Sequence, residues 1–140
     1  MTEHSEHTRK NKILAIDDDG LVRRTLELLL KEAGYEPTMA AGGQEALGLL
    51  ARQHFDLVIT DIRMPEIDGL QVIQAVHDYC GQMKKPLIPV IVLTAYKDEP
   101  VRQAAVRMGV KEFLLKPFKM DEFLKVLERT LRDAANGRLH

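Results

Sequence analysis

The sequence predicts an α/β fold, a single doubly wound parallel sheet of five strands with helices on both faces. A short apolar or β-branched run, a turn and a segment with helical spacing follow one another five times along the 140 residues. Two of the runs, DLVIT and IPVIVLT, are almost entirely apolar, which is typical of strands buried on both faces. The chain is 45% hydrophobic and 29% charged, which suits one globular domain.

The first expected strand is KILAI, residues 12–16, and a helix follows over about 20–33. Gly34 would end that helix in the left-handed conformation, which glycine adopts without steric cost. Four apolar residues at helical spacing would line one face of the helix: Val22, Leu26, Leu29 and Ala33.

The second strand is expected over residues 35–40, at an edge of the sheet. Pro37 has no N–H, so this strand cannot pair fully on both sides. Of the two common doubly wound strand orders, 2-1-3-4-5 places the second strand at an edge. The sequence therefore favours this flavodoxin-like order over the Rossmann order.

The rest of the chain continues the alternation. Strands are expected at 56–60, 88–94 and 111–115, and helices at about 42–53, 68–80, 98–108 and from 120 onward. Pro100 falls in the first turn of a helix, where a missing N–H costs little. The stretch GQMKKP, residues 81–86, is expected to form an exposed linker.

Polar or charged residues follow four of the five strands. Asp17 and Asp18 follow the first strand, Asp61 the third and Lys116 the fifth, while Thr94 ends the fourth. The carboxyl ends of parallel strands share one edge of the sheet, and ligands bind there where the strand order reverses. Helix capping would explain an Asp or Thr at such a place, but it would not explain a lysine after FLL.

Three carboxylates in one cleft would raise one another's pKa unless a cation lay among them. A few hard oxygen ligands suit Mg²⁺. Lys116 would add a fixed positive charge and Thr94 a hydroxyl group. A metal, an ammonium and a hydroxyl around one carboxylate indicate phosphoryl transfer, because the transferred group spreads negative charge over three equatorial oxygens.

The segments ILAIDDD, DLVITDIRMPEIDG, VIVLTA and FLLKPF together resemble the receiver domain of bacterial two-component response regulators. The resemblance covers about residues 12–132. It implies a phosphorylation-dependent signalling switch, in which Asp61 accepts a phosphoryl group from a sensor histidine kinase, a histidine phosphotransfer protein or a small phosphodonor. Such a protein is not an enzyme in the usual sense, since it catalyses only its own phosphorylation and dephosphorylation.

The resemblance also implies a metal site. Asp18 would bind Mg²⁺ directly, together with Asp61, and Asp17 would bind it mainly through water. The backbone carbonyl of Arg63 would be a further ligand. The side chains of Arg63 and Tyr96 would flank the path of the water that hydrolyses the aspartyl phosphate, and their size predicts a long-lived phosphorylated state.

Other matching residues would contact the phosphoryl group or respond to it. Thr94 would form a hydrogen bond with the group and shift with it, and small Ala95 would leave room. Lys116 would pair with Asp61 or with the phosphoryl oxygens, and the peptide bond between Lys116 and Pro117 would be cis. Phe113 occupies the position of the switch aromatic residue, which turns inward as Thr94 moves.

Several nearby residues have simpler explanations. Asp19 and Asp68 precede helices, so both are expected to be N-caps or turn residues. His4 and His7 lie near the N-terminus, and His54 and His77 have no companion in the sequence, so none is expected to bind a metal.

Three alternative functions fit the sequence less well. A haloacid dehalogenase-type phosphatase would use Asp17 as its nucleophile, but Leu21 stands where its motif has Thr or Val, and TDIRMPEIDG would be unexplained. A flavin-binding electron carrier needs a Ser/Thr-rich phosphate loop after the first strand, where this chain is acidic. A receiver that has lost its switch would lack some of the key residues, all of which are present.

Residues 1–11 are expected to be a flexible tail, 12–134 the receiver domain and 135–140 a short tail without an output domain. The chain would then act on a protein partner or form a homodimer through the face built by the helix at 98–108, the fifth strand and the last helix.

The net charge of −1 argues against direct binding of nucleic acid. A lone cysteine, Cys80, and the lack of an apolar signal or membrane segment favour the cytoplasm. Five basic residues make the expected interaction face partly basic: Arg102, Arg107, Lys111, Lys125 and Arg129.

Overall fold

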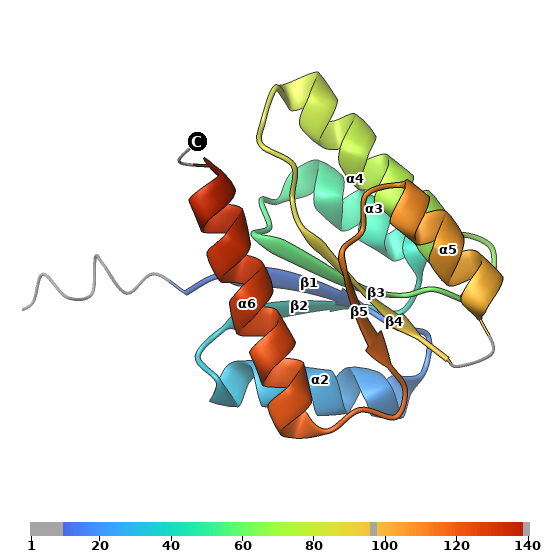
Figure 1. Ribbon diagram of the computed structural model, residues 1–140, viewed down its shortest axis with the longest axis vertical. Helices are drawn as coiled ribbons and strands as arrows, with labels where there is room; N and C mark the ends of the chain where they lie inside the picture. Colours follow the sequence, from blue (N-terminus) through green and yellow to red (C-terminus); the bar gives the residue numbers. More distant parts are fainter. Residues whose placement is uncertain (1–9, 96–97, 139–140) are drawn as a thin grey trace, which may run out of the picture.

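The computed structural model describes residues 10–95 and 98–138. Five parallel strands form one sheet in the order β2-β1-β3-β4-β5 (Figure 1). The predicted fold class and strand order are therefore confirmed. The strands are β1 (Lys12–Ile16), β2 (Glu36–Ala40), β3 (Leu57–Asp61), β4 (Val90–Thr94) and β5 (Glu112–Leu115).

Five helices cover the two faces of the sheet. Helices α2 and α6 lie on one face, and α3, α4 and α5 lie on the other (Figure 1). None of the helices in the described part of the chain is long and apolar enough to cross a bilayer. The helices are α2 (Gly20–Glu32), α3 (Gly43–Arg52), α4 (Gly69–Met83), α5 (Glu99–Arg107) and α6 (Met120–Arg138).

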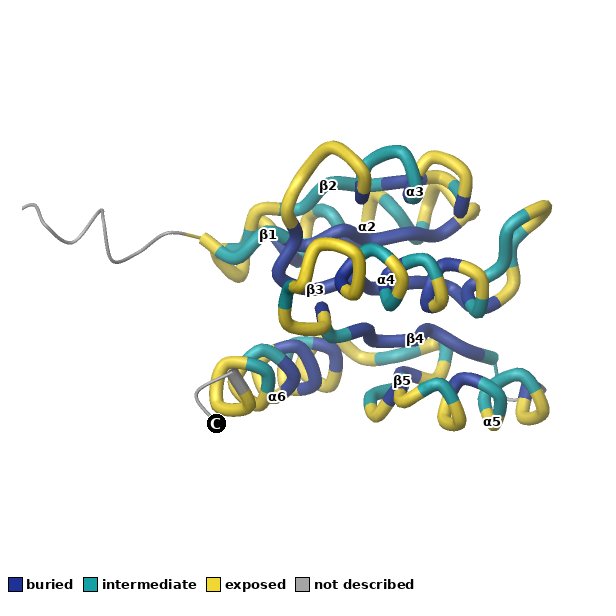
Figure 2. Tube along the Cα trace, turned by 90° about the horizontal axis from the view of Figure 1, so that it is seen from above, coloured by how far each residue is buried: buried dark blue, intermediate teal, exposed yellow. Residues whose placement is uncertain are grey.

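Each face of the sheet has its own apolar cluster. In β1, Ile13 and Ala15 belong to the cluster with α2 and α6, whereas Leu14 and Ile16 belong to the cluster with α3, α4 and α5. This alternation follows from the two-residue period of a strand. All five residues of β3 and of β4 are buried, and the central strands form the dark interior of Figure 2. The carboxyl ends of these strands are thereby held rigidly side by side.

The edge position of β2 agrees with its proline. Pro37 pairs with Ile13 of β1, and no strand of the described residues lies on its other side, so its missing N–H leaves no gap in the sheet. Asn11 was expected to lie in the flexible tail, but its carbonyl accepts a hydrogen bond of 2.9 Å from the Glu36 N–H. The other expected tail residues up to residue 9 lie outside the described residues.

Some helix boundaries differ from the sequence prediction. Helix α4 continues to Met83, so the first half of GQMKKP is helical, because Lys84 rather than Gly81 adopts the left-handed cap conformation. Helix α6 continues to Arg138, so residues 135–138 are helical and not a tail. Its apolar pattern ends earlier, but helix-favouring residues such as Ala135 extend it.

The bounds of helix α2 agree with the prediction, but its buried residues differ in part from those expected. Gly34 follows α2 with φ +92°, as expected. Leu26 and Leu30 are the fully buried residues, however, and Ala33 is exposed. Ala33 is the C-cap residue, so it lies beyond the last helical turn and cannot continue the helical stripe.

Candidate functional site

The carboxyl ends of four strands, β1, β3, β4 and β5, lie along one edge of the sheet, which we call the rim. In the strand register, Ile16 of β1 pairs with Thr60 of β3, Asp61 pairs with Leu93 of β4, and Thr94 pairs with Leu115 of β5. The residues that follow these positions therefore emerge side by side. The predicted meeting of the polar residues at this rim is confirmed by their contacts.

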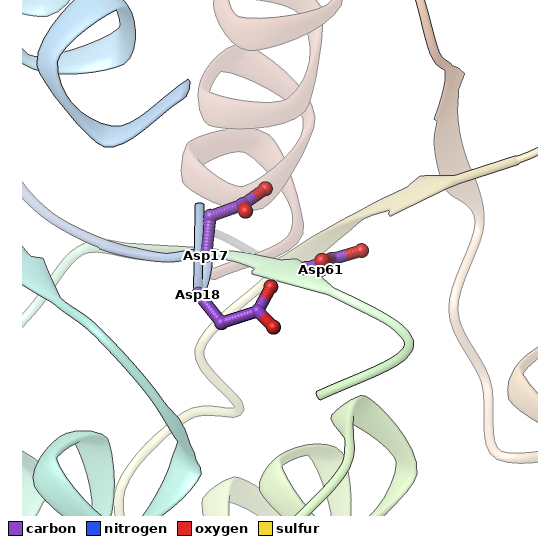
Figure 3. A group of neighbouring side chains, drawn as sticks. All are labelled: Asp17, Asp18 and Asp61. Atoms are coloured by element: carbon purple, nitrogen blue, oxygen red, sulfur yellow. The ribbon is translucent and has the colours of Figure 1, made fainter. Parts of the chain in front are cut away.

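Three carboxylates form what we call the acidic cluster: Asp17, Asp18 and Asp61. One oxygen of each lies within 4.8 Å of the others. The side chains of Asp17 and Asp18 extend toward the side on which Asp61 lies (Figure 3). Asp17 and Asp61 are buried, whereas Asp18 is exposed. Among the described residues, no other three His, Cys, Asp or Glu side chains form such a group.

Lys116 places its ammonium group between two members of the acidic cluster. Its Nζ lies 2.8 Å from Asp17 Oδ2 and 3.4 Å from Asp61 Oδ2. The Lys116 N–H donates to the Thr94 carbonyl at 2.8 Å, and the peptide bond to Pro117 is cis. The ammonium group therefore lies closer to Asp17 than to Asp61.

Burial and neighbouring charges perturb the carboxyl group of Asp61. Desolvation, followed by the charge of Asp17, raises the pKa of Asp61 to about 6, although Lys116 opposes the rise. Burial lowers the pKa of Lys116, but its hydrogen bond to Asp17 and the charges of Asp61 and Asp17 outweigh this effect, so the pKa of Lys116 is raised. The three carboxylates of the acidic cluster therefore carry more negative charge than the single ammonium group of Lys116 can neutralise.

Asp17 is held in place from three directions. Besides Lys116, the Asp19 N–H donates to Asp17 Oδ1 at 2.9 Å, and the Arg23 guanidinium donates to the Asp17 carbonyl at 2.8 Å. Asp19 in turn caps α2, since its carboxylate accepts from the Leu21 and Val22 N–H groups. The cap role of Asp19 is confirmed. The contact of Arg23 was missed, because a charged residue in the first turns of a helix carries no sequence signal for such a bond.

The predicted switch residues lie close to the rim. Thr94 is 2% exposed, and its hydroxyl donates to the Ala95 carbonyl at 3.2 Å. Phe113 is half-buried against the cluster on the α3, α4 and α5 face. The Arg102 guanidinium lies 4.7 Å from the centre of the Phe113 ring. The switch roles themselves remain predictions.

The Arg63 side chain pairs with a residue outside the acidic cluster. Its Nε donates to Asp98 Oδ1, a contact that joins the loop after β3 to the start of α5. This hydrogen bond, together with the charge of Asp98, raises the pKa of the Arg63 guanidinium. The sequence did not indicate this pair, because the two residues are 35 positions apart. Tyr96, predicted to flank the water path with Arg63, lies outside the described residues.

The remaining singled-out residues have structural roles. Asp68 and Gln71 form a capping box at the start of α4, so the cap role of Asp68 is confirmed. His54 was expected to have no companion, but its Nε2 lies 2.9 Å from Asp56 Oδ1 across the turn before β3. His77 is half-buried on α4. His4 and His7 lie outside the described residues.

Two glycines let helices approach the loop that follows Asp61. A Cβ on Gly69 would lie 2.6 Å from the Asp61 carbonyl oxygen and 2.8 Å from the Ile62 Cα. A Cβ on Gly43 would lie 2.5 Å from the Ile67 side chain. The Gly69 N–H also donates to the Ile62 carbonyl at 2.9 Å. Close packing of α3 and α4 thus sets the position of the Asp61 backbone.

Gly69→Ala should destabilise the chain by about 2 kcal/mol, since backbone atoms cannot yield to the new methyl group as a side chain could. Denaturant unfolding measures the change, and ¹⁵N chemical shifts should locate the disturbance at residues 61 and 62. Gly81→Ala is the matched control in the same helix. Nothing lies within 4 Å of its added Cβ, so it should raise stability by up to about 1 kcal/mol. Equal effects of both variants would contradict the close-approach argument.

Comparison with known proteins agrees with this geometry. A family model described as the response regulator receiver domain matches residues 13–128. The probable transcriptional regulator ycf27 of Porphyridium aerugineum is 36% identical over 135 residues, which are 94% of this chain and 54% of that protein. The regulatory protein AtoC of Escherichia coli K12 is 36% identical over 125 residues, 89% of this chain and 26% of that protein. The chain thus spans between about a quarter and about half of the length of these relatives.

Solved structures show the same fold. The chemotaxis protein CheY4 of Vibrio cholerae superposes with a TM-score of 0.78 at 32% identity, over 87% of this chain and 99% of that chain. A signal receiver domain of an HD domain-containing protein from Pseudomonas fluorescens Pf-5 gives a TM-score of 0.81 at 27% identity, over 91% of this chain and 99% of that chain. Neither these structures nor the family match supports the haloacid dehalogenase alternative. The chain belongs to the response regulator receiver domain family.

Proposed function

We propose that this chain is a signalling switch in which Asp61 accepts a phosphoryl group with the assistance of Mg²⁺. The observation that carries the proposal is the surroundings of Asp61, where two further carboxylates and one ammonium group converge on a single buried carboxylate. A receiver domain is a signalling domain and not a classical enzyme, so the reaction proposed here is its own modification.

The donor set fits Mg²⁺. Mg²⁺ prefers a small number of carboxylate oxygens as protein ligands and usually keeps several waters. The acidic cluster offers one oxygen from each of three carboxylates, all within 4.8 Å of one another, so Asp18 and Asp61 would bind the ion directly and Asp17 through water, with the Arg63 carbonyl as a further ligand. When bound, the ion would neutralise charge on the cluster and on the oxygens of the transferring group.

The chain's own groups have distinct tasks in the proposed transfer. Asp61 is ionised above its pKa of about 6, so at neutral pH its carboxylate oxygen can form a bond to phosphorus. The bond between phosphorus and the donor breaks, and its electron pair leaves with the donor, a histidine nitrogen or the carboxylate of an acyl phosphate. Lys116 and the Thr94 hydroxyl would donate hydrogen bonds to the phosphoryl oxygens, over which the developing negative charge is spread.

The response would pass from Thr94 to the face formed by α5, β5 and α6. A shift of Thr94 and an inward turn of Phe113 would change this face, which would contact a downstream protein or a second copy of the chain. Exposed Leu115 and Val106 support such a contact. The basic character of the face is smaller than expected, since Arg129 pairs with Glu112 at 2.7 Å and Arg102 pairs with Glu99 at 3.4 Å. A sensor histidine kinase or a phosphotransfer protein in the cytoplasm would supply the phosphoryl group.

The decisive experiment incubates the chain with acetyl phosphate and Mg²⁺ and locates the label by peptide mapping with mass spectrometry. We expect the label on Asp61, and we expect it to be lost when a chelator removes Mg²⁺ or when Asp18 is replaced in Asp18→Ala. A label on Asp17 would instead support the phosphatase alternative. No label on either residue, with Mg²⁺ present and the chain folded, would refute the proposed switch.

A further inference from the structure

We propose that Asp98 is a positioning residue for the reaction at Asp61: through its ion pair with Arg63 it closes one side of the site and slows hydrolysis of the phosphorylated aspartate. The inference rests on the function proposed above and adds a residue to it. Asp98 lies four positions after Thr94, and it pairs with Arg63, which lies two positions after Asp61.

The Arg63–Asp98 pair joins two loops that begin side by side. Asp61 ends β3 and Thr94 ends β4, and these strands are neighbours, with Asp61 opposite Leu93. The loops that carry Arg63 and Asp98 both start at this rim. The ion pair between them therefore lies on the β4 side of Asp61, whereas Asp17 lies on the β1 side.

The two partners differ in how firmly they are held. The Asp98 side chain is 6% exposed, whereas the Arg63 side chain is 63% exposed. Asp98 stands at the N-cap position of α5, but its side chain makes no cap hydrogen bond to that helix. Its backbone N–H donates to the Ala95 carbonyl at 3.0 Å, and its carbonyl accepts from the Arg102 N–H at 2.9 Å. Asp98 is thus the fixed member of the pair, and it turns its carboxylate to Arg63 and not to its own helix.

Arg63 needs such an anchor to keep one position. An exposed arginine side chain has several rotatable bonds, and holding it in one conformation costs conformational entropy. The buried carboxylate of Asp98 offsets this cost, because a charge-assisted hydrogen bond to a partly desolvated partner is stronger than one at the open surface. Without Asp98, the Arg63 guanidinium would leave the bridge and sample solvent.

Closing this side of the site slows hydrolysis of the aspartyl phosphate, because it restricts the approach of water. A water molecule attacks the phosphorus of the aspartyl phosphate in line with the Asp61 oxygen that leaves. The new bond joins the water oxygen to phosphorus, the bond to Asp61 breaks, and the products are the free carboxylate, inorganic phosphate and a proton. Attack needs an ordered water at the open rim, and the bridge narrows the approach from the β4 side.

The test follows the decay of phosphate from the whole chain. The protein is phosphorylated with acetyl phosphate and Mg²⁺, the donor is removed, and released phosphate is measured over time. We expect Asp98→Asn and Arg63→Ala each to speed decay by about three- to tenfold. The double variant should decay no faster than Arg63→Ala alone, since Asp98 acts through Arg63.

Glu99→Gln is the matched control. Glu99 is the next residue along α5, and it pairs with Arg102 at 3.4 Å on the exposed surface, so its variant should decay at the wild-type rate. Stabilisation by Mg²⁺ in thermal melts should be the same for Asp98→Asn and wild type, which separates a change in hydrolysis from a damaged metal site.

The outcomes separate this inference from the proposed function. A wild-type chain that takes up no phosphoryl group refutes the proposed switch. Uptake followed by wild-type decay in Asp98→Asn refutes the role of Asp98, and so does a double variant whose effect is the product of the two single effects. If Asp98→Asn does not fold, Asp98→Glu, which keeps the charge, should decay close to the wild-type rate and Arg63→Ala faster, and equal rates in these two variants would overturn the inference.

Discussion

Asp61→Asn is expected to abolish phosphoryl uptake and, at the same time, to stabilise the folded chain at neutral pH. An amide is too weak a nucleophile to replace the carboxylate. The stability effect comes from the raised pKa of Asp61, about 6 in the folded protein against an ordinary 3.8. The folded protein therefore binds this proton more tightly than the unfolded chain does.

The sign of the pH dependence follows from that difference. The contribution of Asp61 to stability is fully present below about pH 3.8 and is lost as the pH rises through about 6. Asn carries no charge, so the Asp61→Asn variant does not lose this stability as the pH rises. We expect its free energy of unfolding, measured with urea in the absence of Mg²⁺, to exceed that of wild type by about 2 kcal/mol near neutral pH and to approach it in acid.

Asp68→Asn is the matched control for this prediction. Asp68 caps α4, and Asn serves as an N-cap about as well as Asp, so its variant should change stability little at either pH. A loss of stability in Asp61→Asn at both pH values would show that the carboxylate is not under electrostatic strain in the folded chain.

Lys116→Met is expected to cause the largest loss of stability among the site variants, about 3 kcal/mol at neutral pH without Mg²⁺. Met keeps most of the apolar stem of Lys but removes the ammonium group that contacts Asp17 at 2.8 Å and Asp61 at 3.4 Å. The side chain of Asp17 is completely buried. Its carboxylate would be left facing Asp61 without a counter-charge.

Two further measurements show whether charge is the cause. Millimolar Mg²⁺ should restore part of the lost stability of Lys116→Met, and the double variant Lys116→Met with Asp61→Asn should be more stable than Lys116→Met alone. Lys119→Met, at an exposed position three residues later, should change stability by less than about 0.5 kcal/mol. Equal losses in Lys116→Met and Lys119→Met would refute the electrostatic explanation.

Much of the site was predictable because it depends on topology. Once a parallel sheet with the order 2-1-3-4-5 is recognised, the carboxyl ends of β1, β3, β4 and β5 must share a rim. Asp17, Asp61 and Lys116 then meet without any knowledge of side-chain conformations. The caps at Asp19 and Asp68 were equally predictable, since an N-cap depends only on the few residues that follow it.

Other contacts of the site depend on where long side chains end. Lys116 approaches Asp17 more closely than Asp61, Arg63 reaches Asp98, and Arg23 reaches the Asp17 carbonyl. Each of these groups lies several rotatable bonds from its backbone, and its partner is chosen by loops that pack together only in the folded chain. No periodic pattern connects residues that are 35 or 99 positions apart.

The sequence by itself determined the alternation of strands and helices, the edge position of β2 through Pro37, and the set of residues at the rim, because each rests on local chemistry or on the geometry of parallel strands. The tertiary structure alone decided how the charges pair, how closely α4 approaches Asp61 through Gly69, and that Arg63 pairs with Asp98. These features depend on distances of a few ångströms between distant segments, and only the packed chain sets such distances.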